Sequence, residues 1–447
     1  MGPVADETII AAEVNAPSQN GDSTPGAPSG IHIGYLVQQF PPELGAGPAR
    51  VAEMARRWID AGNRVTVFTG MPNRPQGRIY PGYRRKLWME EEYEGVRVVR
   101  SWLFAHPRHG SLTTLLNNTS FMFTSTVAAV VRGRGLDVLI ASEPPFFPHI
   151  AGAVAAALRR TPLVLEVRDL WPDYIVEMGF GRRRGIARAL FGLERALLRR
   201  SDRVVVVTSS FRDRVIEKGV PPERVEVVSN GVDCTLYYRA EEAPPIEVLR
   251  HSDGEFVIGY LGNMGAGQAL DAVLDAATLL AREDPTVRVV LAGDGPERER
   301  VMARAAKLSL HNLRLHPSIP KEQTRAFYNS CDACLVPLAP VRVFQETVPS
   351  KLFEVMACER PVILCADGEA RAIVEESRCG LVAPPGDARR IADAVLCMRA
   401  SAGDVRQLMG AKGRAYVERH YSRSSLAQSY LEILGQVAGK NGRRLTT

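Results

Sequence analysis

Long apolar runs are missing from this sequence of 447 residues. No stretch reaches the ~20 apolar residues that a helix needs to cross a bilayer. The best candidate, residues 112–131, carries four consecutive polar residues from Asn117 to Ser120, so we expect a buried helix there. The N-terminus has Asp6 and Glu7 rather than basic residues before an apolar core, which argues against a signal peptide. These absences predict a cytoplasmic protein and leave open a peripheral contact with the inner face of the cell membrane.

Cysteine is scarce as well. The seven cysteines lie in the second half of the chain and follow no disulfide framework, which favours a reducing compartment. Cys331 and Cys334 form a lone CxxC pair without a second ligand pair at metal-site spacing, so we interpret them as small core residues. A metal-binding Asp-x-Asp triplet is also absent. We therefore expect no cofactor and no required divalent metal.

Neither sign of charge dominates, and the formal net charge is +6. The basic excess gathers in residues 182–203, where eight arginines stand against Glu194 and Asp202. Two interpretations remain open: a solvated helix face, or a surface that attracts anionic lipid headgroups or a diphosphate-bearing acceptor. Nucleic acid is disfavoured as a partner, because aromatic residues do not alternate with the basic ones.

Short apolar runs alternate with helical patterns from Ile31 onward. A second such series, with strands expected at 256–261 and 287–292, follows a Pro- and Glu-rich linker at 241–245. This alternation predicts an α/β protein of two Rossmann-like, doubly wound domains that face a central cleft. Ligands of open parallel sheets bind beyond the carboxyl ends of the strands. The expected units are a disordered tail (1–30), a first domain (31–238), a second domain (246–415) and a C-terminal helix (416–440) that packs back toward the first domain.

Glycine-rich turns follow strands in both domains. Gly45 and Gly47 stand between the first strand and a helix, where backbone amides can approach an anion. Their spacing is not GxGxxG, so nicotinamide chemistry is disfavoured. The second domain has two further turns, at Gly262-Asn263 and at Gly293-Asp-Gly295. A single glycine turn can equally well have a purely structural role. Two such turns at the strand ends of one sheet favour a phosphate-bearing ligand.

The strongest local signal is the segment 346–357, ETVPSKLFEVMA. Ser350 is placed to cap a helix that begins at Lys351, and this cation with the free amides of the helix can hold a diphosphate. Glu354 stands in an apolar run, where a carboxylate is costly without a partner, and it can accept hydrogen bonds from a ribose diol. The alternative is a surface glutamate followed by a buried helix face.

Charged residues also follow two strands of the first domain. Arg168 and Asp169 come directly after a buried strand, where they form either a structural ion pair or a contact with an acceptor or a developing charge. Glu143 and His149 follow the preceding strand and are acceptor-site candidates. A helix-capping histidine is the alternative for His149.

Together these residues resemble the retaining glycosyltransferases of family four, which adopt the GT-B fold, and among them the fucosaminyltransferase-type enzymes of bacterial polysaccharide assembly. The likeness runs from about Ile31 to Tyr430. Its marks are Arg168-Asp-Leu-Trp-Pro172, Ser229-Asn-Gly-Val-Asp233, Gly293-Asp-Gly-Pro296, Pro349-Ser-Lys-Leu-Phe-Glu354, and a pair of glutamates, Glu346 and Glu354, separated by seven residues.

The resemblance implies transfer of a sugar, with retention at its anomeric carbon, from a nucleotide diphosphate to a lipid-linked glycan or a small-molecule acceptor. We expect a UDP-sugar. Glu354 would bind the donor ribose, Glu346 would face the donor sugar, and Gly45 and Gly47 would approach the diphosphate from the opposite domain. Arg168, Asp169 and Lys351 complete the expected catalytic set.

One turn departs from the family pattern. Many members carry an Arg and a Lys after the first strand of the second domain, but the turn from Gly262 to Gln268 has neither. Lys351 and backbone amides would then neutralise the diphosphate. Two other functions share the architecture: a nucleotide-sugar 2-epimerase, which turns over donor alone, and a non-catalytic nucleotide-sugar-binding protein.

Overall fold

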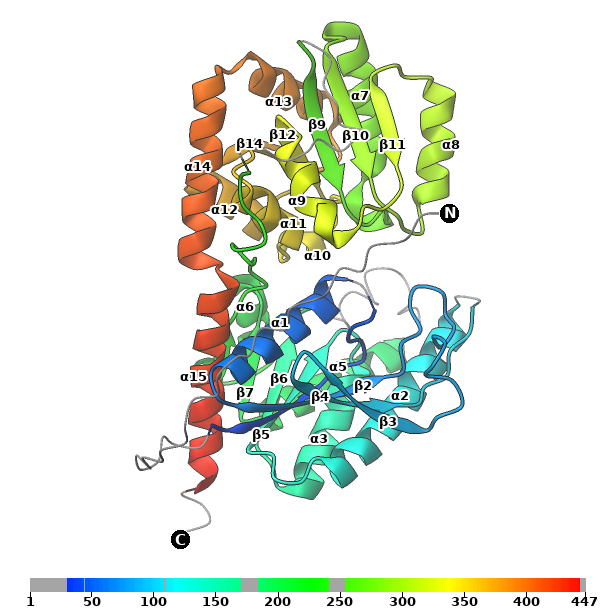
Figure 1. Ribbon diagram of the computed structural model, residues 1–447, viewed down its shortest axis with the longest axis vertical. Helices are drawn as coiled ribbons and strands as arrows, with labels where there is room; N and C mark the ends of the chain where they lie inside the picture. The colour runs from blue at the N-terminus through cyan, green and yellow to red at the C-terminus, as the bar shows by residue number, and fades with distance from the viewer. Residues whose placement is uncertain (1–29, 44, 108–109, 170–183, 241–253, 443–447) are drawn as a thin grey trace, which may run out of the picture.

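The computed structural model describes residues 30–43, 45–107, 110–169, 184–240 and 254–442. Within these ranges the chain forms two α/β units stacked one above the other (Figure 1). Two features singled out in the sequence lie outside the described residues: the first arginines of the basic stretch, Arg182 and Arg183, and the end of the motif that begins at Arg168. The predicted tail, apart from Gly30, and the linker at 241–245 also lie outside.

The N-terminal unit is built on a sheet in the order β3-β4-β2-β1-β5-β6-β7-β8. All neighbouring strands run parallel except β3, which is antiparallel to β4 at the edge. The central strands are apolar runs buried on both faces, as is typical of parallel sheets covered by helices. The strands are β1 (His32–Leu36), β2 (Arg64–Gly70), β3 (Trp88–Tyr93), β4 (Val96–Ser101), β5 (Val138–Glu143), β6 (Leu163–Val167), β7 (Arg203–Val206) and β8 (Val225–Val227). The helices are α1 (Ala46–Asp60), α2 (Ser111–Arg132), α3 (Phe147–Arg159), α5 (Arg184–Arg200) and α6 (Ser209–Glu217).

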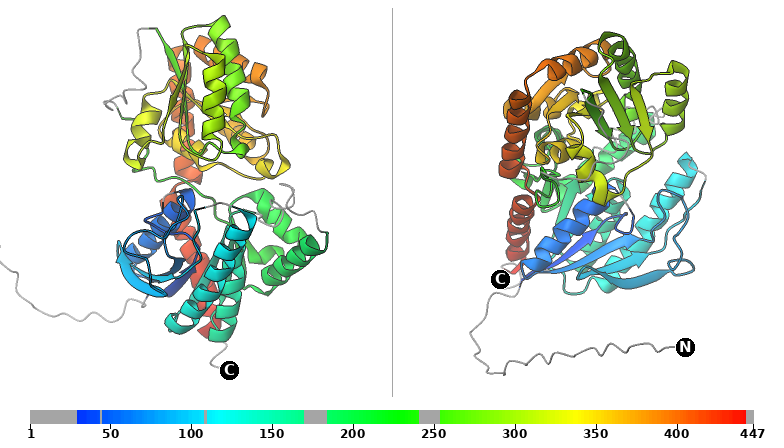
Figure 2. Two further views of the ribbon diagram at one scale, coloured as in Figure 1. Left: turned by 90° about the vertical axis from the view of Figure 1, so that its right-hand side faces the viewer. Right: turned by 45° about the horizontal axis from the view of Figure 1, so that its top comes forward.

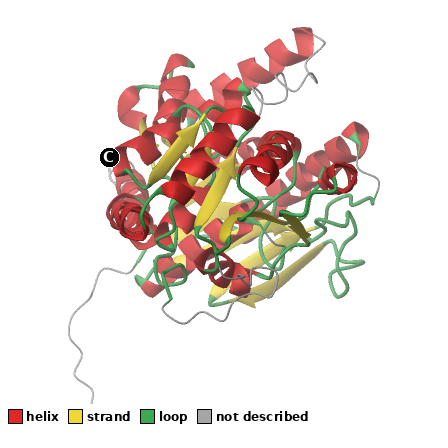
Figure 3. Cartoon of the chain, turned by 90° about the horizontal axis from the view of Figure 1, so that it is seen from above, coloured by secondary structure: helices red, strands yellow, loops and turns green. Residues whose placement is uncertain are grey.

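The C-terminal unit has a parallel sheet in the order β11-β10-β9-β12-β13-β14, with helices on both sides (Figure 3). Its strands are β9 (Phe256–Leu261), β10 (Val287–Ala292), β11 (Leu313–His316), β12 (Ala333–Pro337), β13 (Val362–Cys365) and β14 (Gly380–Ala383). Its helices are α7 (Leu270–Glu283), α8 (Arg298–Leu308), α9 (Lys321–Asn329), α10 (Arg342–Gln345), α11 (Ser350–Ala357), α12 (Glu369–Ser377), α13 (Ala388–Ala400) and α14 (Gly403–His420), and α15 (Arg423–Gly442) follows.

Both sheets have the strand order of a doubly wound fold. In each, the chain starts in the middle, moves outward to one side and then crosses to the other, so the order reverses between β1 and β5 and again between β9 and β12. Loops at such a reversal diverge and leave room for a ligand. The predicted fold class, two Rossmann-like α/β units, is confirmed.

The last two helices run along one side of both units (Figure 1). α14 packs on α11 of the C-terminal unit, and α15 packs on α1 of the N-terminal unit. The Trp58 indole on α1 donates to the Ala427 carbonyl oxygen over 3.0 Å, and its ring meets Tyr430 edge-on with centroids 5.3 Å apart. The end of the chain therefore ties the second unit to the first.

The segment 112–131 is helical, as expected, but it is not buried. α2 covers the sheet with Phe121, Ala128 and Ala129, whereas Leu112 and Phe123 on its outer side are 68% and 67% exposed. The expectation was wrong because the helix lies at the periphery of the unit, where one face packs on the sheet and the other is exposed. Among the helices of the described ranges, none is long and apolar enough to cross a bilayer. Cys331 and Cys334 are buried core residues, as predicted.

Candidate active site

The two units meet where strands of both sheets end. Thr208, which caps α6 after β7, donates its hydroxyl to the Glu346 carbonyl oxygen over 2.9 Å. Arg214 on α6 places its Nε 3.7 Å from Glu346 Oε2. Nearby, the Ser210 amide donates to Glu369 Oε1 over 2.5 Å. The first glutamate of the predicted pair therefore stands at the junction of the units, in contact with the opposite one.

The glycine turns of the C-terminal unit pack against each other. Gly262, Gly293 and Gly295 have φ angles of 151°, 154° and 152°, a region that side chains disfavour. A Cβ on Gly293 would lie 1.8 Å from the Gly262 carbonyl oxygen, and one on Gly295 would lie 2.6 Å from Asn263 Oδ1. The close approach of the two turns thus requires glycine for structural reasons.

Lys351, in the first turn of α11, reaches across to the first of these turns. Its Nζ donates to Gln268 Oε1 over 2.9 Å and lies 4.2 Å from the centre of the Tyr260 ring. A Cβ on Gly262 would lie 2.9 Å from the same nitrogen. Desolvation lowers the pKa of Lys351 to about 7, while the charge of Glu354 opposes that shift. The Lys351 amine therefore lies beside the turn whose own sequence lacks a cation, and it is charged when protonated.

Glu354 is one turn further along α11, and its Oε2 accepts a hydrogen bond of 3.0 Å from the Tyr328 hydroxyl on α9. Burial raises the pKa of this carboxyl, although the Tyr328 hydrogen bond and nearby cations oppose the shift. The carboxylate thus has the partner that an apolar surrounding demands. This arrangement disfavours a plain surface glutamate.

Ser350 does not cap α11. The helix begins at Ser350 itself, and Pro349 occupies the capping position with φ −69° and ψ 130°. Proline suits this position because its fixed φ is compatible with an extended backbone. The N–H that proline lacks is not needed at the start of a helix. The expectation of a serine cap was wrong, and Ser350 instead contributes to the first turn.

In the N-terminal unit, Arg168 lies against the start of α1. Its Nε donates to Ser142 Oγ and to the Glu143 carbonyl oxygen, both at 3.0 Å. A Cβ on Gly47 would lie 3.0 Å from Arg168 Nη1. Gly45, the residue before α1, has φ 141° and ψ 167°. The fold thus brings Gly45, Gly47 and Arg168 together and places a guanidinium beside a helix N-terminus, an arrangement suited to an anion.

The ion pair considered for Arg168 is with a different residue. Arg168 Nε lies 3.8 Å from Glu166 Oε2, whereas Asp169 is exposed. Glu166 is fully buried and also accepts hydrogen bonds from Arg50, Tyr35 and Ser142. Burial opposes its charge, but Arg50, Arg168 and these hydrogen bonds outweigh that effect and hold its pKa below the usual value. This buried network holds the Arg168 side chain in position through Glu166 and Ser142.

Glu143 and His149 are not open to an acceptor. Both side chains are 1% exposed. His149 Nδ1 lies 3.5 Å from Glu143 Oε2, and its Nε2 lies 3.1 Å from the Glu166 carbonyl oxygen. Burial raises the pKa of Glu143 well above its usual value and lowers that of His149 to about 4. The two side chains form no open acceptor contact, because Glu143 ends β5 and α3, which carries His149, packs on that strand.

Sequence reasoning missed four residues that contact the candidates. Thr208 and Arg214 touch Glu346, Gln268 binds Lys351, and Tyr328 binds Glu354. Gln268 had a signal, since it closes the cation-poor turn. The others carried none, because each lies on an ordinary amphipathic helix or at its start.

Comparison with known proteins fits this architecture. Residues 45–231 match the family model "Glycosyl transferase 4-like domain", and residues 255–400 match "Glycosyl transferases group 1". The putative colanic acid biosynthesis glycosyl transferase WcaI of Escherichia coli (strain K12) is 27% identical over 338 residues, which cover 73% of this chain and 81% of the relative.

Two solved structures share the fold. The sucrose-phosphate synthase of Thermosynechococcus elongatus has a TM-score of 0.73 at 19% identity, covering 92% of this chain and 100% of that one. Anabaena Alr3699/HepE in complex with UDP and glucose has a TM-score of 0.65 at 20% identity, covering 90% and 99%. With both units matched to glycosyltransferase families, the chain is a glycosyltransferase of the GT-B fold, an enzyme of hexosyltransferase type.

Proposed function

We propose that this enzyme transfers a sugar, with retention at the anomeric carbon, from a nucleotide diphosphate to a glycan acceptor. The donor lies on the C-terminal unit, assigned residues 246–415, and the acceptor on the N-terminal unit, assigned residues 31–238. The segment 416–440, expected as one helix, is the end of α14 followed by α15, and it joins the two units. The observation that carries the proposal is the position of Lys351, whose Nζ lies 2.9 Å from Gln268 Oε1 beside two glycine turns.

The diphosphate binds between these turns and Lys351. Negative charge grows on the departing phosphate as its bond to the sugar breaks, so a cation held there stabilises the transition state more than the ground state. The anomeric carbon forms its new bond to the acceptor hydroxyl oxygen, and the hydroxyl proton passes to a phosphate oxygen on the same face. Glu346 faces the donor sugar from the junction of the units, and Arg168 and Asp169 serve the acceptor side.

Glu354 binds the ribose diol. Its Oε2 is oriented by Tyr328 at 3.0 Å, which leaves the other carboxylate oxygen to accept from the diol. The chain shares its fold with Anabaena Alr3699/HepE, whose structure is a complex with UDP and glucose, and this likeness supports UDP as the nucleotide. The relative named for colanic acid biosynthesis supports a glycan of polysaccharide assembly, rather than a small molecule, as the acceptor.

A thermal-shift screen of UDP, GDP and their sugars, including a fucosamine donor, tests the donor assignment. A ligand at a hundred times its dissociation constant should stabilise the fold by about 2.7 kcal/mol. Incubation with the selected donor then separates the three functions. Transfer that requires an acceptor supports the proposal, epimerisation of donor alone makes the protein a 2-epimerase, and binding without turnover makes it a nucleotide-sugar-binding protein.

A further inference from the structure

α2 has an apolar outer face in addition to the one that packs on the sheet. Leu112, Leu116, Phe123, Val127 and Val131 are spaced by four or seven residues, which aligns their side chains along one side of the helix, with Thr119 and Ser120 between Leu116 and Phe123. Their exposed fractions run from 41% to 68%. Single exposed apolar residues are ordinary on a protein surface, but an aligned row over the length of a helix is not.

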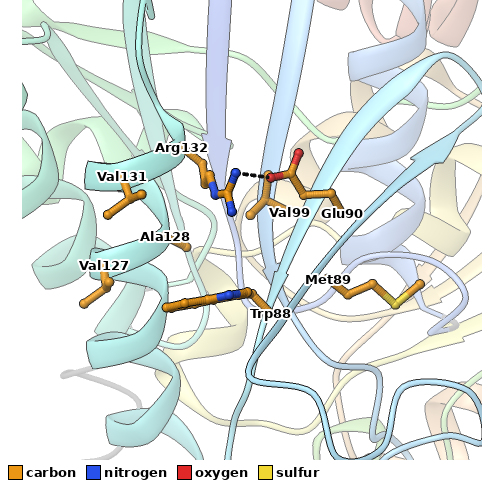
Figure 4. A pocket seen from close by; sticks show the side chains of 8 residues that line it. All are labelled: Trp88, Met89, Glu90, Val99, Val127, Ala128, Val131 and Arg132. Atoms are coloured by element: carbon orange, nitrogen blue, oxygen red, sulfur yellow. Dashed lines mark ion pairs between the residues drawn. The ribbon is translucent and has the colours of Figure 1, made fainter.

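The row continues across a groove onto the neighbouring strand. Val127 and Val131 form one wall and Trp88 of β3 forms the other, around a hollow of about 290 Å³ (Figure 4). Trp88 is 52% exposed although its indole is large and apolar. A tryptophan at the rim of an apolar groove is the arrangement found where a protein meets the headgroup level of a bilayer.

Two more large side chains extend this surface. Thr124 on α2 donates its hydroxyl to the Trp102 carbonyl oxygen over 2.6 Å, and the Trp102 amide donates to the Leu87 carbonyl oxygen over 2.8 Å. Leu87 is 67% exposed and Trp102 36%. On the other side α3, which packs along α2 (Figure 2), leaves Leu158 67% exposed. We call the surface formed by the α2 row with Leu87, Trp88 and Trp102 the α2 face.

Basic side chains outnumber acidic ones around the α2 face. Neither α2 nor α3 contains an Asp or Glu. On β3, Glu90 is held by Arg97 and Arg132 at 2.8 and 3.2 Å, and Glu92 lies further along the same side of the strand. The exposed basic residues at the ends of these elements are Arg84, Arg85, Lys86, Arg132, Arg134, Arg159 and Arg160, whereas the exposed acidic residues there are Glu94 and Asp137.

We infer that the α2 face docks on a bilayer that contains anionic lipid. An apolar helix face with cationic flanks inserts into the headgroup–acyl boundary, and each basic residue near an anionic surface adds attraction. A second copy of this chain is a poor occupant, because pairing two α2 faces would bring two cationic rims together. The charge of the rim thus favours an anionic surface.

Docking here would place the enzyme suitably for an acceptor held in the membrane. On the inner side of α2, Asn117 and Asn118 accept from Gln38 Nε2 at 2.7 and 3.0 Å, and Gln38 is the second residue after β1. One side of α2 therefore forms the exposed α2 face, and its other side contacts a strand end of the N-terminal unit, to which we assign the acceptor. This consequence rests on the proposed function, whereas the docking itself does not.

Vesicle sedimentation with the full chain tests the inference without donor or acceptor, so its failure would leave the proposed function untouched. The wild type should sediment with phosphatidylcholine–phosphatidylglycerol vesicles and much less with phosphatidylcholine alone. The double variant Leu112→Ser/Phe123→Ser should weaken binding at least about tenfold, which corresponds to about 1.4 kcal/mol. Leu408→Ser is the matched control, since Leu408 is 54% exposed on α14, on the other side of the molecule (Figure 1).

The rim is tested by Arg134→Gln/Arg159→Gln/Arg160→Gln, which should lower binding to the mixed vesicles and leave the weak binding to phosphatidylcholine unchanged. Emission of the exposed tryptophans should shift to the blue on binding, and Trp88→Phe should reduce that shift. The inference is overturned if the wild type stays in the supernatant with mixed vesicles, or if the Leu112/Phe123 variant binds as the wild type does. A wild-type dimer in solution that the Leu112/Phe123 variant abolishes would equally overturn it, since the face would then be a self-interface.

Discussion

Lys351 Nζ donates to Gln268 Oε1 over 2.9 Å, although the two residues are 83 positions apart in the chain. The lysine comes from the first turn of α11, and the glutamine closes the turn after β9. The fold thus supplies from one element the positive charge that the other lacks. If the diphosphate binds here, most of its side-chain neutralisation depends on this one ammonium group.

Lys351→Met should therefore lower the turnover rate more than donor affinity. The change keeps an apolar stem but removes the charge that stabilises the leaving group, so turnover should fall on the order of a hundredfold to a thousandfold. Steady-state kinetics with calorimetric donor binding separates the two effects. Asn263→Ala, in the turn itself, should be milder; near wild-type turnover in the lysine variant together with a dead Asn263 variant would move the leaving group to that turn.

The affinity for UDP should decline as the pH rises above 7. Burial lowers the pKa of Lys351 to about 7, and a bound anion favours its charged form, so binding above that pH requires proton uptake. Each pH unit between 7 and 9 should weaken the affinity by up to about tenfold. Titration calorimetry at several pH values measures this slope. In Lys351→Met the slope should disappear, and a slope that persists would assign it to another group.

Glu354→Gln should weaken donor binding by roughly 1.5 to 3 kcal/mol, the cost of losing a hydrogen bond to a charged group. The fold should survive, because an amide oxygen can still accept from the Tyr328 hydroxyl. Calorimetry with UDP measures the loss and thermal unfolding checks the fold. Tyr328→Phe removes the supporting hydroxyl alone and should have a smaller effect; unchanged affinity in the glutamine variant would remove the ribose assignment.

Gly293→Ala should destabilise the C-terminal unit by about 2 to 3 kcal/mol, since the residue combines strained backbone with a contact that leaves no room. A Cβ would lie 1.8 Å from the Gly262 carbonyl oxygen at a φ of 154°. Gly435→Ala on α15, with nothing within 4 Å of its Cβ, should instead stabilise by about 0.5–1 kcal/mol. Denaturant unfolding of both variants checks the contrast, and equal stability would contradict the packing account.

Removal of divalent metal ions with EDTA should leave turnover unchanged. In the proposed mechanism Lys351 and backbone amides meet the diphosphate charge, so a bridging cation has no part in it. Comparison of rates after chelation with rates after Mg²⁺ is restored tests this directly. A rate that collapses on chelation and returns with Mg²⁺ would contradict the proposed mechanism.

The sequence predicted the fold class because the pattern that encodes it is local. The strands expected at 256–261 and 287–292 are β9 and β10 with the same bounds, and their burial on both faces follows from apolar runs that only Arg288, near the start of β10, interrupts. The domain boundaries and the roles of the site residues stay predictions. The segment 346–357 also indicated a charged helix start, although the cap itself fell one residue earlier than expected.

Neighbours distant in the chain decided the rest. His149 and Phe123 both lie on helices with apolar periodicity, yet the first is buried and the second is 67% exposed. Periodicity shows which residues share a face, but only the packing of α2 and α3 decides whether that face has a partner. The sequence by itself therefore determined two doubly wound sheets, the glycine turns that follow their strands, and the helix that carries Glu354. Only the tertiary structure brought Lys351 to Gln268 and Arg214 to Glu346, because these pairs depend on how separate elements pack rather than on any spacing along the chain.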